Sequence, residues 1–394
     1  MQLSVIILNY NVRYFLEQCI LSVENALENI DGEIIVVDNN SSDDSCEMMK
    51  RRFANIKLIE NNKNSGFPKG NNIGVSVAQG EYICILNPDT VVAEDTFVKI
   101  LNFVTSSAVE KDEIGIVGVK LIDGTGNFLP ESKRGIPTPF VAFTKIMGVY
   151  KIFPKSKAFG KYYAQHLSEN ETGKIEILVG AFMLMKRNLY NEIGGFDENC
   201  FMYSDDIDLS YRILQQGKSN YYFHETSVIH YKGESTVKDK MYMKRFQEAM
   251  HFFYKKHFSP DGSGSFFFSV FMKMGIVYFS LVKTIQGKSN PKASPENYIL
   301  ISDNENLREK LEFALKKPVK LQNWNSESIN FAKSFSDNKK TEIIFDQNHL
   351  DFKTIIEAFE TYKNKGFSFK IAPKNTSFLI GSNNSYDRGE IIKM

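Results

Sequence analysis

Two acidic motifs, far apart in the sequence, carry the residues best suited to chemistry. The first is ILNPDTVV at 85–92, an apolar run that ends near Asp89. The second is FMYSDDIDLSYR at 201–212, which holds Asp205, Asp206 and Asp208 inside an aromatic frame. A carboxylate at a strand end can hold a divalent metal with a phosphate, and another can take a proton from a hydroxyl. Together the motifs indicate a site for a metal-bound diphosphate and an acceptor hydroxyl.

The NPDT segment has a structural alternative, because Pro and Asp together favour a turn. In the functional interpretation Asp89 offers a hard oxygen to Mg²⁺ or Mn²⁺, and substrate phosphates complete the coordination shell. The metal would neutralise charge on a leaving diphosphate. Asn87 precedes Asp89 as a neutral partner. His230 is either a core histidine or a metal or phosphate contact, and Lys232 and Ser235 follow it as further phosphate or acceptor contacts.

The SDDIDLSYR segment also has two interpretations. An acidic helix start is stabilised by the helix dipole, and this explains at least one of the aspartates. Alternatively one of them is a general base, with a pKa raised by burial and by the neighbouring charges. At helical spacing Asp205 and Asp208 share a face and Asp206 points elsewhere. Arg212 lies four residues after Asp208 and is expected to pair with it in a structural role.

The elements that must position these residues alternate between strand and helix through the N-terminal half. Four apolar runs predict strands, separated by segments of helical spacing. Such alternation is typical of an α/β fold with an open, mostly parallel sheet, in which ligands bind beyond the carboxyl ends of the strands. Polar triplets follow three of these strands, so we expect them to meet at one edge. The predicted strands are residues 3–8, 32–38, 56–61 and 81–89, and the triplets are 9–11, 38–40 and 87–89.

Several polar and glycine residues near this edge are candidates for binding a nucleotide. Asp38 either caps the next helix or accepts hydrogen bonds from a nucleobase or ribose. A glycine-bearing loop followed by a helix of small residues is expected over 64–80, between Asp38 and Asp89, and Arg134 is a candidate phosphate or acceptor contact. The donor-side candidates are Tyr10, Asn11, Asp38, Asn40, Gly66, Gly70, Asn71 and Asn87.

Composition limits the class of protein. The chain has 394 residues and a net charge of +1, which excludes a globally basic nucleic-acid binder. Lys and Arg outnumber acidic residues locally, at 131–161 and 232–292, which favours phosphates or a lipid surface as partners. The four cysteines form no CxxC pair, so we expect reduced thiols in the cytoplasm. The N-terminal apolar run reads as a strand and not as a signal peptide.

The second half predicts three further regions. Residues 238–257 form an amphipathic pattern, and 264–285 form an apolar helix with a polar stripe that includes Lys273. This stripe favours a helix in the membrane interface over a soluble packing helix or a spanning one. We therefore expect a catalytic domain at 1–237, membrane-associated helices at 238–285, a linker at 286–297 and a small Rossmann-like α/β domain of unknown role at 298–394.

With these residues in hand, residues 1–260 resemble the family 2 glycosyltransferases of the GT-A fold, in particular the rhamnosyltransferase-like branch that builds bacterial surface polysaccharides. The resemblance rests on an ordered set of motifs. It implies that Asp38 and the Tyr10–Asn11 backbone bind the nucleobase, that Asp89 binds the metal and that Asp206 is the catalytic base. The motifs are SVIILNYN, IIVVDNNSSDDS, NSGFPKGNN, LNPDT, GAFMLMKR, GGFDE, SDDIDLSYR and IHYKGES.

The chain departs from the family pattern at two positions. Asn87 replaces the first aspartate of the DxD-like motif, and Asp205 replaces the glutamate that precedes the base. The resemblance implies an inverting transfer by direct displacement, from a dTDP- or UDP-sugar to a saccharide acceptor. We expect this acceptor to be lipid-linked and to lie at the inner-membrane surface. Two alternatives stay open: a non-catalytic nucleotide-sugar sensor or scaffold, and a nucleotidyltransferase, although LNYNVRYFLEQ lacks the phosphate loop that the latter usually has.

Overall fold

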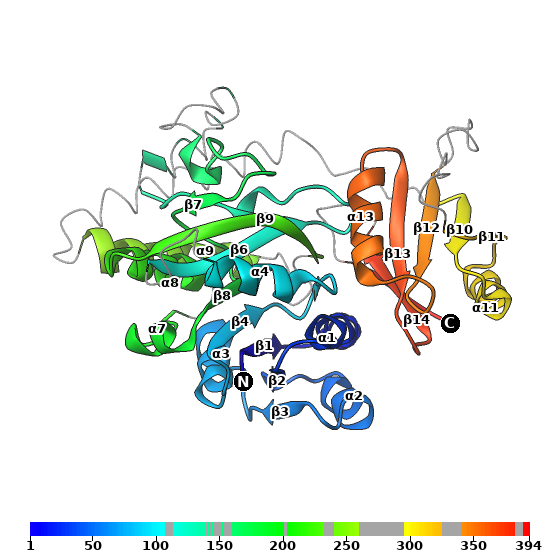
Figure 1. The fold of residues 1–394 in the computed structure, drawn as a ribbon, viewed down its shortest axis with the longest axis horizontal. Helices are drawn as coiled ribbons and strands as arrows, with labels where there is room; N and C mark the ends of the chain where they lie inside the picture. The colour runs from blue at the N-terminus through cyan, green and yellow to red at the C-terminus, as the bar shows by residue number, and fades with distance from the viewer. Residues whose placement is uncertain are drawn as a thin grey trace.

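The computed structural model describes residues 1–106, 113–138, 160–200, 203–231, 240–259, 295–324, 340–382 and 389–394, with a few single residues between 139 and 159. Within these residues the chain forms two sheets, a large one from the N-terminal part and a smaller one from the C-terminal part. Figure 1 shows the two sheets side by side, with helix α13 (Phe352–Tyr362) between them.

The large sheet has the strand order β3-β2-β1-β4-β8-β6-β9-β5, and β7 pairs with β9 outside this path. Strands β1 to β4 are parallel to one another, as the alternation of strands and helices predicts. The next strand, β8, is antiparallel to β4. The strands are β1 Leu3–Asn9, β2 Gly32–Asp38, β3 Lys57–Glu60, β4 Tyr82–Leu86, β5 Thr90–Val91, β6 Ile114–Ile122, β7 Gly173–Ile175, β8 Phe182–Lys186 and β9 Ser219–His230.

Helices cover both faces of the large sheet because its central strands are apolar on both sides. Strand β1 shows this directly: Val5 and Ile7 join the core under α1 and α4, whereas Ile6 and Leu8 join the core under α3 and α8. The α/β class and the mostly parallel sheet are therefore confirmed. The helices are α1 Arg13–Leu27, α2 Ser45–Arg52, α3 Gly66–Ser76, α4 Thr96–Thr105, α7 Arg187–Glu192 and α8 Asp205–Gln215.

The C-terminal sheet has the order β11-β10-β12-β13-β14-β15, with the first four strands parallel and the last two antiparallel. The parallel strands alternate with helices, as in the small α/β domain that the sequence predicts. The elements are β10 Asn297–Ile301, α11 Glu305–Leu315, β11 Val319–Gln322, β12 Thr341–Asp346, β13 Phe367–Ala372, β14 Phe378–Ser382 and β15 Glu390–Lys393.

Helix α9 (Lys240–Phe258) packs on the catalytic part of the chain through its predicted apolar face. Met250 and Phe253 are buried against Ile177 and Ile207. In the described half of α9 this face therefore contacts α8, and the expected membrane association of 238–285 stays a prediction. Among the described residues no helix is long and apolar enough to cross a bilayer. The segment 264–285 lies outside the described residues.

A buried ionic cluster fixes α9 to α8. Asp208 is fully buried and receives Arg212 Nε on Oδ2 at 2.7 Å, which confirms the predicted pair. Its Oδ1 lies 2.8 Å from Lys256 Nζ and 2.7 Å from His257 Nε2, both on α9. Lys256 also contacts Asp197 at 2.6 Å. Burial raises the pKa of Asp208, but the bond from His257 and the charge of Arg212 outweigh it and hold the pKa at about 2.

The variant Asp208→Asn should therefore lose about 3–5 kcal/mol of unfolding free energy at neutral pH, because three donors would face a neutral amide in a buried site. The measurement is urea denaturation of the full chain. Since the folded pKa lies below the ordinary value of about 3.9, this contribution is present at neutral pH and is lost as the pH falls towards 2. Asp197→Asn, at a more exposed site, is the control and should cost under about 1 kcal/mol. Equal losses in the two variants would contradict this assignment.

Candidate active site

The ends of β1 and β2 meet as predicted, and they hold Asp38 in a fixed orientation. Asn9 and Asp38 are register partners in the two parallel strands. Asn9 Nδ2 donates to Asp38 Oδ1 at 2.7 Å, and the backbone N–H of Ser41 donates to Asp38 Oδ2 at 2.8 Å. Asp38 is buried, with 3% of its surface exposed. The carboxylate is therefore oriented by neighbouring groups, and each oxygen keeps acceptor capacity for a ligand group.

Two asparagines in the left-handed backbone conformation shape the loops after these strands. Asn11 has φ of 55° and Asn40 has φ of 66°, a region that Asn tolerates better than most residues. Asn11 Oδ1 accepts from the backbone N–H of Ser42 at 2.6 Å, so the loop after β1 is joined to the loop after β2. Tyr10 is partly exposed beside them. The predicted donor residues Tyr10, Asn11, Asp38 and Asn40 thus lie together.

Asn39 is a residue of this edge that the sequence interpretation missed. It is buried, and its Nδ2 donates to Asn64 Oδ1 at 3.0 Å and to the carbonyl of Gly66 at 3.3 Å. Its Oδ1 accepts from the backbone N–H of Ser65 at 3.0 Å. Asn39 therefore fixes the start of α3 to the end of β2, with Gly66 at a positive φ of 83°. Its position directly after Asp38 in the sequence was the signal that could have identified it as a residue of this edge.

Gly70 and Asn71 do not lie in a loop, and this part of the prediction is wrong. Both are in α3, which begins at Gly66. A Cβ on Gly70 would meet the end of the Leu8 side chain, so a larger residue there would require that leucine to shift. Asn71 is fully buried and donates to the carbonyl of Phe67 at 2.9 Å. Both residues therefore belong to the helix that packs against β1.

The predicted metal residues come together through the pairing of β5 with β9, in which Thr90 is the register partner of His230. His230 Nε2 lies 3.4 Å from Asp89 Oδ1 and 3.3 Å from Asn87 Nδ2. The backbone N–H of Tyr231 donates to the carbonyl of Asp89 at 3.0 Å. The side chains of His230 and Asp89 are 8% and 6% exposed. His230 Nε2 and Asp89 Oδ1 thus face each other at a largely buried site.

This geometry fits a divalent metal ion whose coordination shell would be completed by the substrate. An octahedral ion about 2.1 Å from each ligand needs neighbouring ligand atoms roughly 3 Å apart, close to the observed separation of His230 Nε2 and Asp89 Oδ1. Among the residues that the structure describes, no group of three or more His, Cys, Asp or Glu side chains could hold a metal. A site with two protein ligands depends on substrate phosphates for the remaining positions, as Mg²⁺ sites commonly do.

The two carboxylate oxygens of Asp206 differ in their hydrogen bonds. Arg134 Nη2 donates to Asp206 Oδ2 at 2.6 Å and to the carbonyl of Leu178 at 2.9 Å, and the backbone N–H of Gly180 donates to the same oxygen at 3.1 Å. Asp206 Oδ1 is buried and has no hydrogen-bond partner among the described residues. Burial lowers the pKa of Arg134, but the charge of Asp206 outweighs it and raises that pKa above its ordinary value. Arg134 is therefore a permanent cation that orients Asp206.

Asp205 differs from Asp206 in its expected charge. Burial raises the pKa of Asp205 well above the ordinary range of an aspartate, and the neighbouring charge of Asp206 raises it further. Backbone N–H groups act in the opposite direction but do not compensate. The two neighbouring residues can therefore carry one negative charge between them at neutral pH, and Asp205 is the one that holds the proton.

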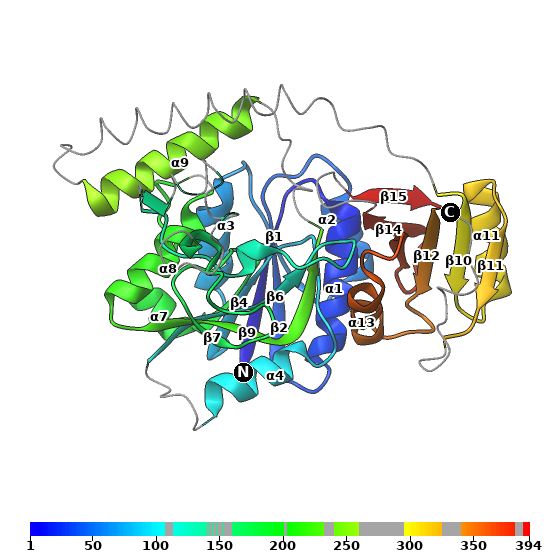
Figure 2. The ribbon, with the colours of Figure 1, turned by 90° about the horizontal axis from the view of Figure 1, so that it is seen from above.

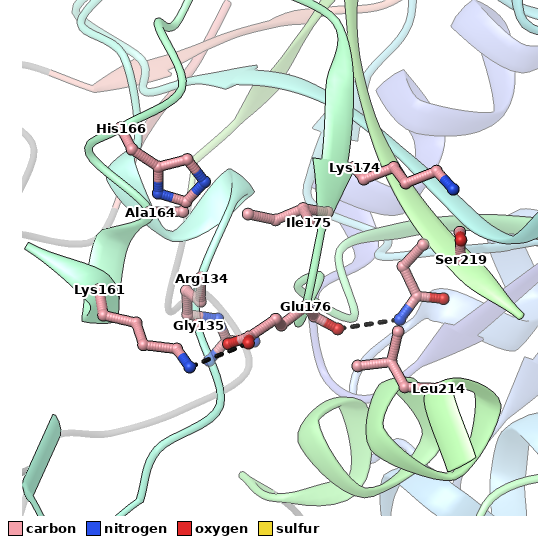
Figure 3. A pocket seen from close by; sticks show the side chains of 11 residues that line it. Arg134, Gly135, Lys161, Ala164, His166, Lys174, Ile175, Glu176, Leu214 and Ser219 are labelled. Atoms are coloured by element: carbon pink, nitrogen blue, oxygen red, sulfur yellow. Dashed lines mark hydrogen bonds and ion pairs between the residues drawn. The ribbon is translucent and has the colours of Figure 1, made fainter. Parts of the chain in front are cut away.

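A cavity of about 450 Å³ lies behind Arg134, away from the donor residues. Figure 3 shows Lys161 and Glu176 joined beside this cavity, with His166 and Ile175 nearby. Of the predicted site residues only Arg134 lines it. The cavity is therefore not the predicted donor site. The predicted Lys232 and Ser235 lie outside the described residues.

Comparison with known proteins identifies the catalytic part. Residues 4–194 match the model described as Glycosyl transferase family 2. The chain carries a family 2 glycosyltransferase domain. This confirms the resemblance stated from the motifs. The match ends before α8, so the roles of Asp206 and His230 stay predictions.

Relatives of this glycosyltransferase include two proteins named as rhamnosyltransferases. An N-acetylglucosaminyl-diphospho-decaprenol L-rhamnosyltransferase of Mycobacterium tuberculosis is 24% identical over 250 residues, which are 60% of this chain and 78% of that protein. Rhamnosyltransferase WbbL of Escherichia coli is 25% identical over 224 residues, 53% of this chain and 78% of that protein. A mannosyltransferase from Pyrobaculum calidifontis, solved with GDP-Man and Mn²⁺, aligns with a TM-score of 0.45 at 15% identity over 72% of this chain and 76% of that one.

Substitution of His230, the predicted metal ligand, should weaken metal binding without abolishing the nucleotide site. We expect His230→Gln to raise the dissociation constant of Mn²⁺, titrated into protein with a saturating nucleoside diphosphate, by roughly tenfold or more. Isothermal titration calorimetry gives this value. His224→Gln is the matched control, since His224 lies on the same strand and contacts Thr172 at 2.9 Å. Unchanged Mn²⁺ affinity in His230→Gln would exclude His230 as a ligand.

The protonated state of Asp205 predicts how stability depends on pH. Because the folded pKa is raised, the associated stability is present below the ordinary value of about 3.9 and is lost as the pH rises towards the folded pKa. Relative to wild type, Asp205→Asn should therefore gain about 1.4 kcal/mol of unfolding free energy per pH unit across this window. Chemical denaturation at several pH values measures the difference. Parallel profiles for the two proteins would show that Asp205 is ionised in the folded chain.

Proposed function

We propose that the chain is an inverting glycosyltransferase that moves a sugar from a nucleotide-diphosphate donor, a dTDP- or UDP-sugar, to a lipid-linked saccharide in cell-surface polysaccharide synthesis. The names of the mycobacterial and Escherichia coli relatives support this class of reaction and acceptor. The family match supports glycosyl transfer itself. The proposed location is the cytoplasmic face of the inner membrane, where such an acceptor would be presented, and the basic zones at 131–161 and 232–292 support it.

The observation that carries the mechanism is the asymmetric environment of Asp206. One oxygen is occupied by Arg134 and by the backbone of Gly180, and the other has no partner among the described residues. A general base needs one fixed, open acceptor atom within hydrogen-bond distance of the proton that it removes. Asp206 Oδ1 meets this description, and the fixed Oδ2 holds it in one direction.

In the proposed reaction the acceptor hydroxyl oxygen attacks the anomeric carbon of the donor sugar. A new carbon–oxygen bond forms as the bond from that carbon to the diphosphate oxygen breaks, and the configuration at the carbon inverts. The hydroxyl proton passes to Asp206 Oδ1, and the bonding electrons leave with the nucleoside diphosphate. Asp205, already protonated, can donate a hydrogen bond to the acceptor without competing for this proton.

The donor would lie along the sheet edge from β2 to β5. Asp38, with Tyr10, Asn11 and Asn40 beside it, would bind the nucleoside, and Asp89 and His230 would hold Mg²⁺ or Mn²⁺. When bound, this ion would neutralise the charge that develops on the leaving diphosphate. The proposed roles agree with the spacing of the site, because Asp38 and Asp89 lie at the ends of strands on either side of β1.

The direct test is Asp206→Asn. This variant should bind nucleotide sugar as wild type does and should lose transfer by roughly 10²–10⁴-fold, because the amide cannot accept the proton. Asp205→Asn is the matched neighbour and should keep most of the activity, since an amide resembles the protonated acid. Transfer is measured by product formation with a lipid-linked saccharide acceptor. Wild-type rates in folded, donor-binding Asp206→Asn would contradict the proposal.

The donor is identified first by calorimetric titration with UDP-, dTDP- and GDP-sugars, each with and without Mn²⁺. Metal-dependent binding of one donor names the sugar for the transfer assay. Donor binding without transfer to any acceptor would favour a nucleotide-sugar sensor or scaffold. Release of diphosphate from a nucleoside triphosphate would instead favour a nucleotidyltransferase.

A further inference from the structure

The C-terminal unit, residues 295–394, shares a buried core with the catalytic domain. Fully buried Val91 and Ile229, at the sheet edge that carries the metal residues, join one apolar cluster with Ile343, Phe345 and Phe359 of this unit. Figure 2 shows the unit beside α1, and Tyr14 of α1 packs edge-on against Phe378 with ring centroids 4.9 Å apart. A continuous core across the two parts means that they fold against each other rather than as independent units.

The shared core supports the metal site from behind. Successive residues of a strand point to opposite faces. His230 faces Asp89, and its neighbours Ile229 and Tyr231 are buried in the shared core. The ring of Tyr231 packs edge-on against Phe15 at 5.3 Å. The residues on both sides of the histidine are therefore held by contacts that include the C-terminal unit.

A second connection joins this unit to the segment that follows Asp89. Glu94 Oε1 accepts from the backbone N–H of Phe352 at 2.9 Å, and Oε2 accepts from that of Lys353 at 2.8 Å. These are the first two residues of α13, whose N–H groups have no partner within the helix. A carboxylate is also favoured there by the helix dipole. Glu94 thus caps a helix of the other unit, a few residues after the metal ligand.

An ion pair extends this connection. Asp95 lies 2.7 Å from Lys353 and 3.1 Å from Lys99. Burial raises the pKa of Asp95, but the bonds from Lys353 and Lys99 outweigh it and lower that pKa. Further along the contact, Lys120 pairs with Glu360 at 2.8 Å. The contacts to α13 thus extend from the segment after Asp89 to strand β6, which pairs with β9.

We propose that the C-terminal unit positions the metal site of the catalytic domain, with Glu94 as the positioning residue that transmits the contact from α13 to Asp89. This inference rests on the proposed function, because it concerns the metal that would hold the donor diphosphate. The backbone from Asp89 to Glu94 is fixed at one end by Tyr231 and at the other by α13. Loss of the α13 contact leaves the separation of Asp89 and His230 less constrained, and metal affinity falls.

Glu94, which contacts α13, lies on the segment that follows Asp89 at the metal end of the site. Asp38 is oriented by Asn9 and Ser41, which belong to the catalytic domain. A purely stabilising C-terminal unit would affect both ends equally when its contact is weakened. A positioning unit changes the affinity for the metal while the affinity for the nucleoside stays the same. This difference separates the two roles.

The experiment compares Glu94→Gln with Asp351→Ala in the full chain. Asp351 caps the same helix from within the C-terminal unit, accepting from the backbone N–H of Thr354 at 2.8 Å. Both variants weaken the start of α13, but only the first alters the contact with the catalytic domain. The probes are Mn²⁺ titrated with saturating UDP or dTDP, and the nucleoside monophosphate alone without metal. Thermal unfolding gives the stability of each variant.

We expect Glu94→Gln to raise the dissociation constant of Mn²⁺ by roughly tenfold, with nucleoside monophosphate binding unchanged. Asp351→Ala should lower the temperature of thermal unfolding by a similar amount and keep the wild-type Mn²⁺ affinity. Lys353→Met, a milder change at the same contact, should raise the dissociation constant of Mn²⁺ by a smaller factor. This variant tests the proposal if Glu94→Gln does not fold. Equal Mn²⁺ affinities in all variants would overturn the positioning role alone. Failure of wild type to bind any nucleoside diphosphate with metal would overturn the proposed function as well.

Discussion

The pairing of β5 with the end of β9 is the constraint on which the site depends. It is a short antiparallel contact, with Thr90 opposite His230 and Val91 opposite Ile229. It brings together Asp89 and His230, which come from distant parts of the chain and from strands of opposite direction. Without this pairing the distance between the Asp89 carboxylate and the His230 imidazole would not be fixed. A strand pair of this length is marginal by itself, which explains why both of its apolar residues lie in a core shared with the C-terminal unit.

Burial and charge give three aspartates of α8 three different states. Burial and the charge of Asp206 raise the pKa of Asp205, whereas donors from α8 and α9 lower the pKa of Asp208. Asp206 lies between them with one oxygen bound to Arg134. The same side chain, placed within one turn of a helix, thus serves as a neutral acid, an oriented carboxylate and a structural anion. The number and type of surrounding donors decide which state is adopted.

The sequence predicted most of the catalytic sheet, because its signals are local. Apolar runs, polar triplets at their ends and helical spacing together predicted an open, mostly parallel sheet with Asp38 and Asp89 at one edge. The pairing of Asp208 with Arg212 was also predictable, since both lie on one helix. Gly70 and Asn71 were misplaced because a glycine that packs against a strand has the same appearance in sequence as one in a loop.

The features that were not predicted depend on contacts between distant residues. The apolar face of α9 is compatible with a membrane or with a protein surface, and only the tertiary structure shows that its described half contacts α8. Glu94 has no local signal, because the helix that it caps begins in the other unit. The orientation of Asp206 by Arg134 joins residues from separate segments. Side-chain partners across such distances cannot be read from spacing along the chain.

Pulsed electron paramagnetic resonance of Mn²⁺, bound to the protein with a nucleoside diphosphate, would show whether His230 and the substrate diphosphate bind the same ion. We expect simultaneous coupling of the manganese to ¹⁴N and to ³¹P, with the ¹⁴N coupling lost in His230→Gln. Coupling to ³¹P without ¹⁴N in wild type would show that the imidazole does not bind the metal, and would contradict the account.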